Sequence, residues 1–551
     1  MKNRYNKKIA GVLMVVMLVC LGACEEAGFL DRYPKDSPNP LNFFVNEVSA
    51  RSAVNACYTP WLFDHSHMYR RDLPILMDAL TDDSYPSPNR SDEVALKKWN
   101  INPTSGQILN WWRFPYRSIN AANFAIENIP LSTDPAFTSE MQAPYIAEAK
   151  FFRAYSYWFL TSFYGNIPLL TNPSADFEEF NTPVSPRADV LAQVVEDFTD
   201  AKNNLPASQT LQGAPNKSAA AAFLAKMYLV LKDWSKAEAA AREAIQIAEA
   251  AGHKLQDDFL SIWSDEWNPE ILFAWSFTEN VDGWSQNMTV QRLCRNLPAT
   301  LKLGVYGDGW GTLNPQRALF DAFEQDDPRR EYTLFYPGQD FGIYNGTSDF
   351  NYTHETYNEN GEKVTWNVTY KPGDMVKYDY RWGVTGMNTR KMIQSMKGLV
   401  NVYQCGQDVP LMRMAELYLI LAEALAEQGK PEALTWVNKV RGRSSVNAPA
   451  RALNDGRPGG SSLVGIVRHE RRVELALEGL RIFDLLRWGT LPEVFGDGKK
   501  VKRHFFSDYY PAGSAEKYDT PIGNLTLDPV FPIPQDELDH NSSIDSNNPG
   551  W

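Results

Sequence analysis

The sequence predicts a mainly α-helical protein in which helical hairpins form a scaffold that a large irregular insert caps. Three observations support this fold class. Apolar residues recur at spacings of three and four before residue 250 and after residue 405. Residues 216–250 and 411–443 share a pattern of two paired helices. Residues 252–404 are instead rich in Gly, Asn, Asp and aromatic residues, which indicates loops, short helices and a few strands.

Residues 1–23 are predicted to be a lipoprotein signal peptide. Basic residues precede an apolar run at positions 9–21, which is too short to span a bilayer comfortably. Small residues then lead directly to Cys24, a pattern that resembles a bacterial lipobox, so we expect Cys24 to be lipidated. Residues 24–40 contain three prolines and are expected to form a tether, followed by a single domain over 41–551.

The composition argues against several classes of partner. Residues 1–23 carry four positive charges and no negative one, so their removal changes the formal net charge from −13 to −17. This charge argues against nucleic acid or an anionic lipid surface as the main partner. The remaining cysteines, apart from Cys24, are Cys57, Cys294 and Cys405, which can form neither a complete disulfide framework nor a CxxC zinc site.

Helical segments follow one another along the first half of the chain. The apolar spacing predicts helices within 45–58 and 111–129, and a long helix from 144 that ends at Gly165. In 216–250, one helix carries Phe223 and its neighbours on one face. A second helix carries alanines that allow close antiparallel approach.

This helix pair resembles a tetratricopeptide (TPR) repeat, whose period is about 34 residues. Residues 411–443 share the helix pattern of residues 216–250, although few of their residues are identical. Residues 143–163 and 186–204 could form another helix pair. Residues 463–488 could supply the last one. TPR-like helices are therefore expected within about 41–250 and 405–490. The capping region is expected within about 252–404, where residues 363–371 alternate as a strand does.

The densest cluster of charges lies in residues 470–488. In helical register, Glu470, Glu474 and Glu478 follow one another at spacings of four, and Arg481 precedes Asp484 by three. Apolar residues cover much of the remaining helical surface, which predicts a buried helix whose charges must be paired. This pattern favours a structural network over an active site.

No catalytic residue, metal site or cofactor is predicted. The sequence contains no HExxH, GxSxG or GxxxxGK[ST] motif, and the glycines of 307–311 lack the GxGxxG spacing. His65 and His67 could suggest a metal, but a solvated loop is the favoured interpretation. Adjacent carboxylates such as Asp82 and Asp83 are common by chance in so acidic a chain.

Binding is better supported than catalysis, because several aromatic residues lie in polar, Gly-rich segments of the sequence. Proteins often meet the flat C–H face of a sugar with an exposed aromatic ring beside polar groups. Trp284, Trp310 and Tyr306 fit that description best, and packing as loop anchors is the alternative. The further candidates for ligand contact are three aromatic residues (Trp61, Tyr85 and Trp99) and three polar residues (Asn102, Asn287 and Asp308).

Several segments together resemble the SusD/RagB family of outer-membrane nutrient-uptake lipoproteins. They include "CEEAGFLDRYP" after the lipobox, "AEAKFFRAYSYWFLTSFYGNIPLL", "NPQRALFDAFEQDDPRR", "RMAELYLILAEALA" and "FPIPQDELDHNSSIDSNNPGW", in addition to residues 470–488. The departures are small: Asn547 stands where the family often has Gln, Trp551 where it often has Tyr, and Cys57 where it often has Gly.

The resemblance implies a SusD-like fold and a non-enzymatic, lipid-anchored protein of the outer membrane that faces the cell exterior. Such a protein captures an oligosaccharide and delivers it to a SusC-like TonB-dependent transporter. Glu25 and Glu26 are similar to the acidic export signal of such lipoproteins, or are two ordinary tether residues. The alternatives are a TPR-type scaffold for protein partners and a peptide-binding, RagB-like uptake lipoprotein. The aromatic loops of the insert favour glycan binding over a pure scaffold.

Overall fold

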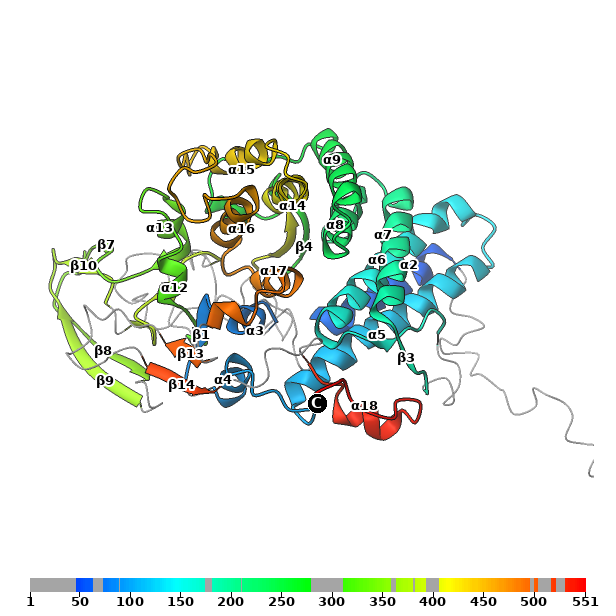
Figure 1. Ribbon diagram of the computed structural model, residues 1–551, viewed down its shortest axis with the longest axis horizontal. Coiled ribbons are helices and arrows are strands. Elements are labelled where there is room, and N and C mark those ends of the chain that lie inside the picture. Colours follow the sequence, from blue (N-terminus) through cyan, green and yellow to red (C-terminus); the bar gives the residue numbers. More distant parts are fainter. Residues whose placement is uncertain are drawn as a thin grey trace, which may run out of the picture.

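The computed structural model describes residues 46–62, 73–88, 90–173, 181–209, 211–278, 311–357, 363–379, 382–392, 406–495, 500–503, 517–521 and 531–551. Helices make up about half of these residues, and the strands are short (Figure 1). The mainly helical fold class predicted from the sequence is therefore confirmed. Within the described residues, none of the helices combines the length and the apolar character that crossing a bilayer requires.

The helices of the first half of the chain form a layered array (Figure 1). They are α2 (Glu47–Leu62), α3 (Leu73–Ala79), α4 (Ser91–Lys97), α5 (Gly106–Asn128), η2 (Ile129–Leu131), α6 (Ser139–Tyr164), α7 (Arg187–Asn204), α8 (Lys217–Val230), α9 (Trp234–Ala250) and α10 (Ser261–Ser264). Helix α2 packs on α5 and α6, and each helix from α5 to α9 packs beside the next one in sequence.

The predicted ends and pairings of these helices are well reproduced. Helix α6 ends at Tyr164, and Gly165 follows with a φ of 72°, a left-handed conformation that glycine adopts at low cost. Helices α8 and α9 form the predicted antiparallel pair, with buried alanines such as Ala222 and Ala241 between them. Small side chains at the interface allow this close approach.

A second group of helices comes from the C-terminal part of the chain, and α14 joins the two groups by packing on α8, α9, α15 and α16. The elements are α12 (Arg317–Phe320), α13 (Arg329–Thr333), α14 (Met414–Glu427), α15 (Ala433–Arg441), α16 (Leu463–Glu474), α17 (Arg481–Trp488), η6 (Glu493–Phe495) and α18 (Gln535–His540).

Residues 470–488 differ from the sequence prediction in one respect. They form the end of α16, a turn, and α17, because Leu477 and Gly479 adopt φ values of 62° and 73° that no α-helix contains. The backbone N–H of Gly479 donates to Asp78 Oδ2 at 3.0 Å, which fixes this turn. Glu478 therefore lies in the turn and not on a helix with Glu474.

The strands of the described residues form separate two-stranded antiparallel sheets, with the pairs β1–β5, β2–β3, β4–β12, β6–β11, β7–β10, β8–β9 and β13–β14. Their bounds are β1 Ser84–Pro86, β2 Ile167–Pro168, β3 Val184–Ser185, β4 Ile271–Trp275, β5 Leu313–Pro315, β6 Leu334–Phe335, β7 Asp340–Ile343, β8 Phe350–Tyr357, β9 Lys363–Tyr370, β10 Met375–Lys377, β11 Asn388–Thr389, β12 Val409–Arg413, β13 Lys500–Arg503 and β14 Lys517–Pro521. The strand predicted over 363–371 is confirmed as β9, which pairs with β8 from Phe350↔Tyr370 to Tyr357↔Lys363.

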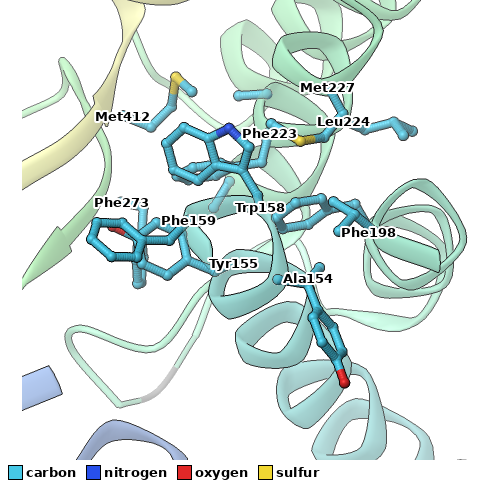
Figure 2. Packing of buried hydrophobic residues seen from close by; sticks show 14 of the residues in the cluster. Ala154, Tyr155, Trp158, Phe159, Phe198, Phe223, Leu224, Met227, Phe273 and Met412 are labelled. Carbon is cyan, nitrogen blue, oxygen red and sulfur yellow. The ribbon is translucent and has the colours of Figure 1, made fainter. Parts of the chain in front are cut away.

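The main core lies where α6, α7, α8 and the β4–β12 pair meet (Figure 2). Trp158 of α6 lies 6.2 Å from the ring of Phe223 of α8, and Phe223 stacks on Phe198 of α7 at 5.5 Å. Phe273 of β4 closes the cluster at 6.3 Å from Phe223. Burial of each such side chain contributes about 1.5–3 kcal/mol, so this aromatic cluster holds the helical array on the β4–β12 pair.

Candidate functional site

The charged segment 470–488 forms a buried ion-pair network. Arg413, the last residue of β12, donates to Glu474 Oε1 at 2.8 Å, to Glu478 Oε1 at 2.7 Å and to Glu270 Oε1 at 2.8 Å. Arg329 of α13 donates to Glu474 Oε2 at 2.9 Å. Arg329 and Glu474 have no exposed side-chain surface, and that of Arg413 is 1% exposed.

These pairs explain how the carboxylates remain ionised inside the protein. Burial by itself would raise the pKa of Glu474, but the guanidinium groups of Arg413, Arg443 and Arg329 together lower that pKa far below its ordinary value. The pKa of Glu478 is lowered in the same way, because Arg413 and Lys391 outweigh burial.

A second cluster joins α16 and α17 directly. Arg471 donates to both carboxylate oxygens of Asp484 at 2.8 Å, and Arg487 donates to Asp484 Oδ1 at 2.8 Å and to Glu423 Oε2 at 2.9 Å. The turn between α16 and α17 brings Arg471 to Asp484, thirteen residues later in the sequence. Paired, buried charges have a structural function, so this segment is not an active site.

Three of the aromatic residues predicted to contact a ligand lie in the interior, and that prediction is wrong for them. Trp61 is 0% exposed and lies 5.1 Å from the ring of Tyr155. Tyr85 of β1 is 1% exposed, and Trp99 is 2% exposed and lies 6.3 Å from the ring of Phe531. Elements distant in sequence cover the rings of Trp61 and Trp99.

The other predicted contacts have different outcomes. Asn102 is exposed, and its Oδ1 accepts hydrogen bonds from the backbone N–H and the hydroxyl of Thr104 at 3.0 and 2.9 Å. This side chain therefore fixes a turn and remains at the surface. The remaining predictions (Trp284, Asn287, Tyr306, Asp308 and Trp310) lie outside the described residues, as do His65 and His67. The described residues hold no group of three or more His, Cys, Asp or Glu that could bind a metal ion.

The described residues contain a cleft of about 600 Å³ between α5 and α18, which we call the α5–α18 cleft. One long face of α5 forms its first wall. The second wall comes from β2 and the residues after it, from Asn181 and Thr182, and from α18. The lining residues are Leu109, Trp112, Arg113, Tyr116, Arg117, Ile119, Asn120, Asn123, Pro168, Leu170, Asn172, Asn181, Thr182, Asp536, Glu537, His540 and Asn541.

Side chains of the α5 wall hold the opposite backbone in place. The hydroxyl of Tyr116 donates to the carbonyl of Pro168 at 2.8 Å, and Asn123 Nδ2 donates to the carbonyls of Leu170 and Asn172 at 2.9 and 3.1 Å. Burial, followed by the proximity of Tyr157 and Glu537, raises the pKa of Tyr116 well above its ordinary value, so this phenol stays a hydrogen-bond donor. The shape of this wall is therefore fixed before any ligand arrives.

Helix α18 is fixed by a further set of bonds. Trp112 Nε1 donates to Glu537 Oε2 at 3.2 Å, and Asn541 Nδ2 donates to Glu537 Oε1 and to the carbonyl of Thr182, both at 2.9 Å. Asp536 Oδ1 lies 3.8 Å from His540 Nδ1. The cleft thus combines an apolar and aromatic floor with arginines on one rim and acidic residues on the other.

The cleft was not predicted from the sequence, although the residues of its α5 wall form a recognisable helical pattern there. Leu109, Trp112, Arg113, Tyr116 and Arg117 recur at spacings of three and four, which places them on one helical face. An apolar stripe that also carries two arginines is unusual for a core-facing surface. The other wall was hidden, because α18 is more than 400 residues away in sequence.

Comparisons with known proteins cover both halves of the chain. The SusD family model matches residues 269–551, and a second model, described as "Starch-binding associating with outer membrane", matches residues 29–229. The SusD-like protein P2 of Formosa agariphila is 25% identical over 98% of this chain and 99% of its own.

Solved structures give the same result. A SusD-like carbohydrate-binding protein of Bacteroides fragilis matches with a TM-score of 0.72 and 25% identity, over 91% of this chain and 99% of its own. Surface glycan-binding protein A of Bacteroides fluxus matches with a TM-score of 0.67 and 20% identity, over 92% and 100%. The resemblance drawn from the sequence motifs is therefore confirmed.

Proposed function

Because this chain belongs to the SusD family, we propose that it is a glycan-binding lipoprotein of the cell surface with no catalytic function. It captures an oligosaccharide and delivers it to a SusC-like TonB-dependent transporter. The observation that carries this proposal is the match to the B. fragilis protein, which is described as carbohydrate-binding and is aligned over nearly its whole length. The description of the second family model supports association with the outer membrane.

Two regions are proposed to contact the glycan. The first is the group of loop residues in the insert, with Trp284, Tyr306 and Trp310 as stacking surfaces and Asn287 and Asp308 as polar partners. Asn102 is a further polar candidate because it is exposed. The second is the α5–α18 cleft, whose volume of about 600 Å³ is within the range of about 300–1,000 Å³ typical of small-molecule sites.

Calorimetry and affinity electrophoresis against a panel of polysaccharides test the binding proposal. We expect the wild-type protein to bind at least one glycan. Trp284→Ala and Trp310→Ala should each weaken binding roughly tenfold, or about 1.4 kcal/mol, because a stacking surface is lost. Trp436→Ala is the matched control, since this half-buried tryptophan of α15 packs on Tyr418 of α14 at 5.3 Å.

The panel includes peptides, so that it also tests the alternatives. A folded protein that binds no glycan would contradict the proposal. Binding of peptides alone would favour a RagB-like uptake lipoprotein, and binding of neither would favour a TPR-type scaffold.

The proposed location in the outer membrane and the proposed transporter partner are tested with isolated membranes. We expect the protein to fractionate with the outer membrane and to copurify with a large β-barrel protein. Cys24→Ala should release it, because the lipid chains attached to Cys24 are its proposed anchor. Retention of Cys24→Ala in the membrane would show that the anchor is assigned to the wrong residue, and absence of the barrel from gently solubilised membranes would contradict the partner.

A further inference from the structure

We propose that the α5–α18 cleft binds a sugar unit that carries an anionic group, a carboxylate or a sulfate, and that Arg113 holds that group. This inference rests on the proposed function, because it takes the ligand of the cleft to be a glycan. It adds the chemical class of the ligand and the residue that selects it.

The first step is the charge of the α5 wall. Arg113 and Arg117 are exposed, lie one helical turn apart and both line the cleft. Their guanidinium groups lie over the ring of Phe114, 5.1 and 5.4 Å from its centroid. A ring orients a guanidinium group without neutralising its charge.

The second step is that Arg113 has no carboxylate partner within the described part of the chain. Its Nη2 donates to Asn110 Oδ1 at 3.2 Å, which is a neutral acceptor. Buried arginines of this protein, such as Arg413 and Arg329, each contact two or more carboxylates. An exposed arginine held by a ring and an amide therefore keeps donors available for an anion, and the fork of a guanidinium group matches a carboxylate or sulfate.

The third step is the opposite wall, which provides acceptors for hydroxyl groups. Both carboxylate oxygens of Glu537 already accept hydrogen bonds, from Trp112 Nε1 and from Asn541 Nδ2. Asp536 is 62% exposed and points toward solvent beside His540. A ligand that bridges the cleft must bring an anion to α5 and hydroxyl donors to α18, and an acidic sugar carries both.

The fourth step is preorganisation. The bonds from Tyr116 and Asn123 to the backbone at Pro168 and Leu170 hold the walls, and the hydroxyl of Tyr157 also donates to the carbonyl of Leu170 at 2.7 Å. A site that is already ordered loses less conformational entropy when a ligand binds. Leu109 and Leu170 add an apolar floor for the C–H face of the sugar ring.

Calorimetry with the full-length protein and matched polysaccharides tests the inference. Polygalacturonate supplies carboxylates and dextran sulfate supplies sulfates, while dextran and starch are neutral. We expect the protein to bind at least one of the anionic polymers, and the variant Arg113→Gln to bind it at least tenfold more weakly. Arg113→Lys should retain part of the affinity. Arg242→Gln, a change at a surface arginine on α9, should leave it unchanged.

The outcomes separate this inference from the proposed function. Loss of anionic binding in the Gln variant, with an unchanged melting temperature and unchanged binding of any neutral glycan, supports the inference. Equal binding of the anionic polymer by the wild type and the Gln variant overturns it, as does an equal loss in Arg242→Gln. Binding of neutral glycans alone overturns the inference and leaves the proposed function standing. Binding of no polysaccharide at all contradicts the proposed function itself.

Discussion

At the scale of single residues, Glu474 shows why the most charged segment of the chain is part of its framework. It accepts hydrogen bonds from arginines that come from three separate parts of the sequence, Arg329, Arg413 and Arg443. Removing one partner from a buried pair leaves the others as uncompensated charges, which is far more destabilising than loss of a surface pair.

We therefore expect Glu474→Gln to lower the free energy of unfolding by about 3–5 kcal/mol. Urea denaturation monitored by circular dichroism measures this change. Asp321→Asn removes an exposed pair with Arg317 and should change stability by no more than about 0.5 kcal/mol. Similar values for the two variants would contradict a structural function of the network.

Trp61 illustrates the limit of reading exposure from neighbouring residues. It lies between a proline and a stretch that contains Asp and His, which led to the expectation of an exposed ring. In the fold it is on the same side of α2 as buried Cys57, four residues earlier, and Trp275 stacks on it at 6.3 Å. Helical periodicity was the better guide at this position.

At the scale of elements, the turn between α16 and α17 decides the geometry of the charged segment. The apolar pattern runs through residues 470–488 without a break, so periodicity alone favoured one helix. The positive φ values of Leu477 and Gly479 end α16, and α17 then leaves in a direction that brings Asp484 to Arg471. The strain at Leu477 is tolerated because the buried contacts around it hold the turn.

Gly489, the residue that follows α17, gives a test at the scale of elements. Gly489 has a φ of 70° and a ψ of 24°, and nothing lies within 4 Å of the position where a Cβ would stand. Gly489→Ala should therefore destabilise the protein by about 1 kcal/mol through backbone strain alone.

The matched control is Gly106→Ala at the start of α5, which also has open space around it but has no positive φ. We expect this variant to be as stable as the wild type or slightly more so, since alanine favours helix. Thermal melting of the two variants measures the difference. Equal melting temperatures would exclude strain as the cause.

At the scale of the whole molecule, ion pairs hold together segments that are far apart in sequence. Asp82 contacts Arg472 and Arg481 at 2.9 and 2.6 Å, across roughly 400 residues. Asp327 pairs with Arg329 beside Glu470 and Glu474. The N-terminal helices, the insert and the C-terminal helices are thereby fixed to one another.

These pairs predict how stability depends on pH. Burial opposes ionisation, but neighbouring arginines lower the pKa values of Asp82, Glu474 and Asp484 below their ordinary values. The unfolded chain therefore binds more protons than the folded chain as the pH falls through the ordinary pKa values, 3.8 for Asp and 4.5 for Glu. The stability from these groups is fully present above that range and is lost as the pH falls below it. Asp408 acts in the opposite direction, because burial raises its pKa to about 6, and burial also raises the pKa values of Asp78 and Asp197.

We expect the urea midpoint to fall steeply below about pH 4.5, since the carboxylates with lowered pKa values outweigh those with raised ones. Unfolding curves between pH 7 and pH 3 measure it. Glu474→Gln should lose less stability over the same range, because one of the depressed groups is absent. A midpoint that stays constant down to pH 3 would contradict the prediction.

The sequence by itself determined the mainly helical fold, the α8–α9 and α14–α15 hairpins and the end of α6 at Gly165, because apolar spacing and end signals act within one helix. Its motifs also carried the resemblance to the family. Only the tertiary structure decided that Trp61, Tyr85 and Trp99 are buried and that Arg471 pairs with Asp484. It also decided that Arg113 and Asp536 face one cleft. These properties depend on which elements pack together in the fold. The local sequence pattern does not indicate which residue, hundreds of positions away, will contact a given side chain.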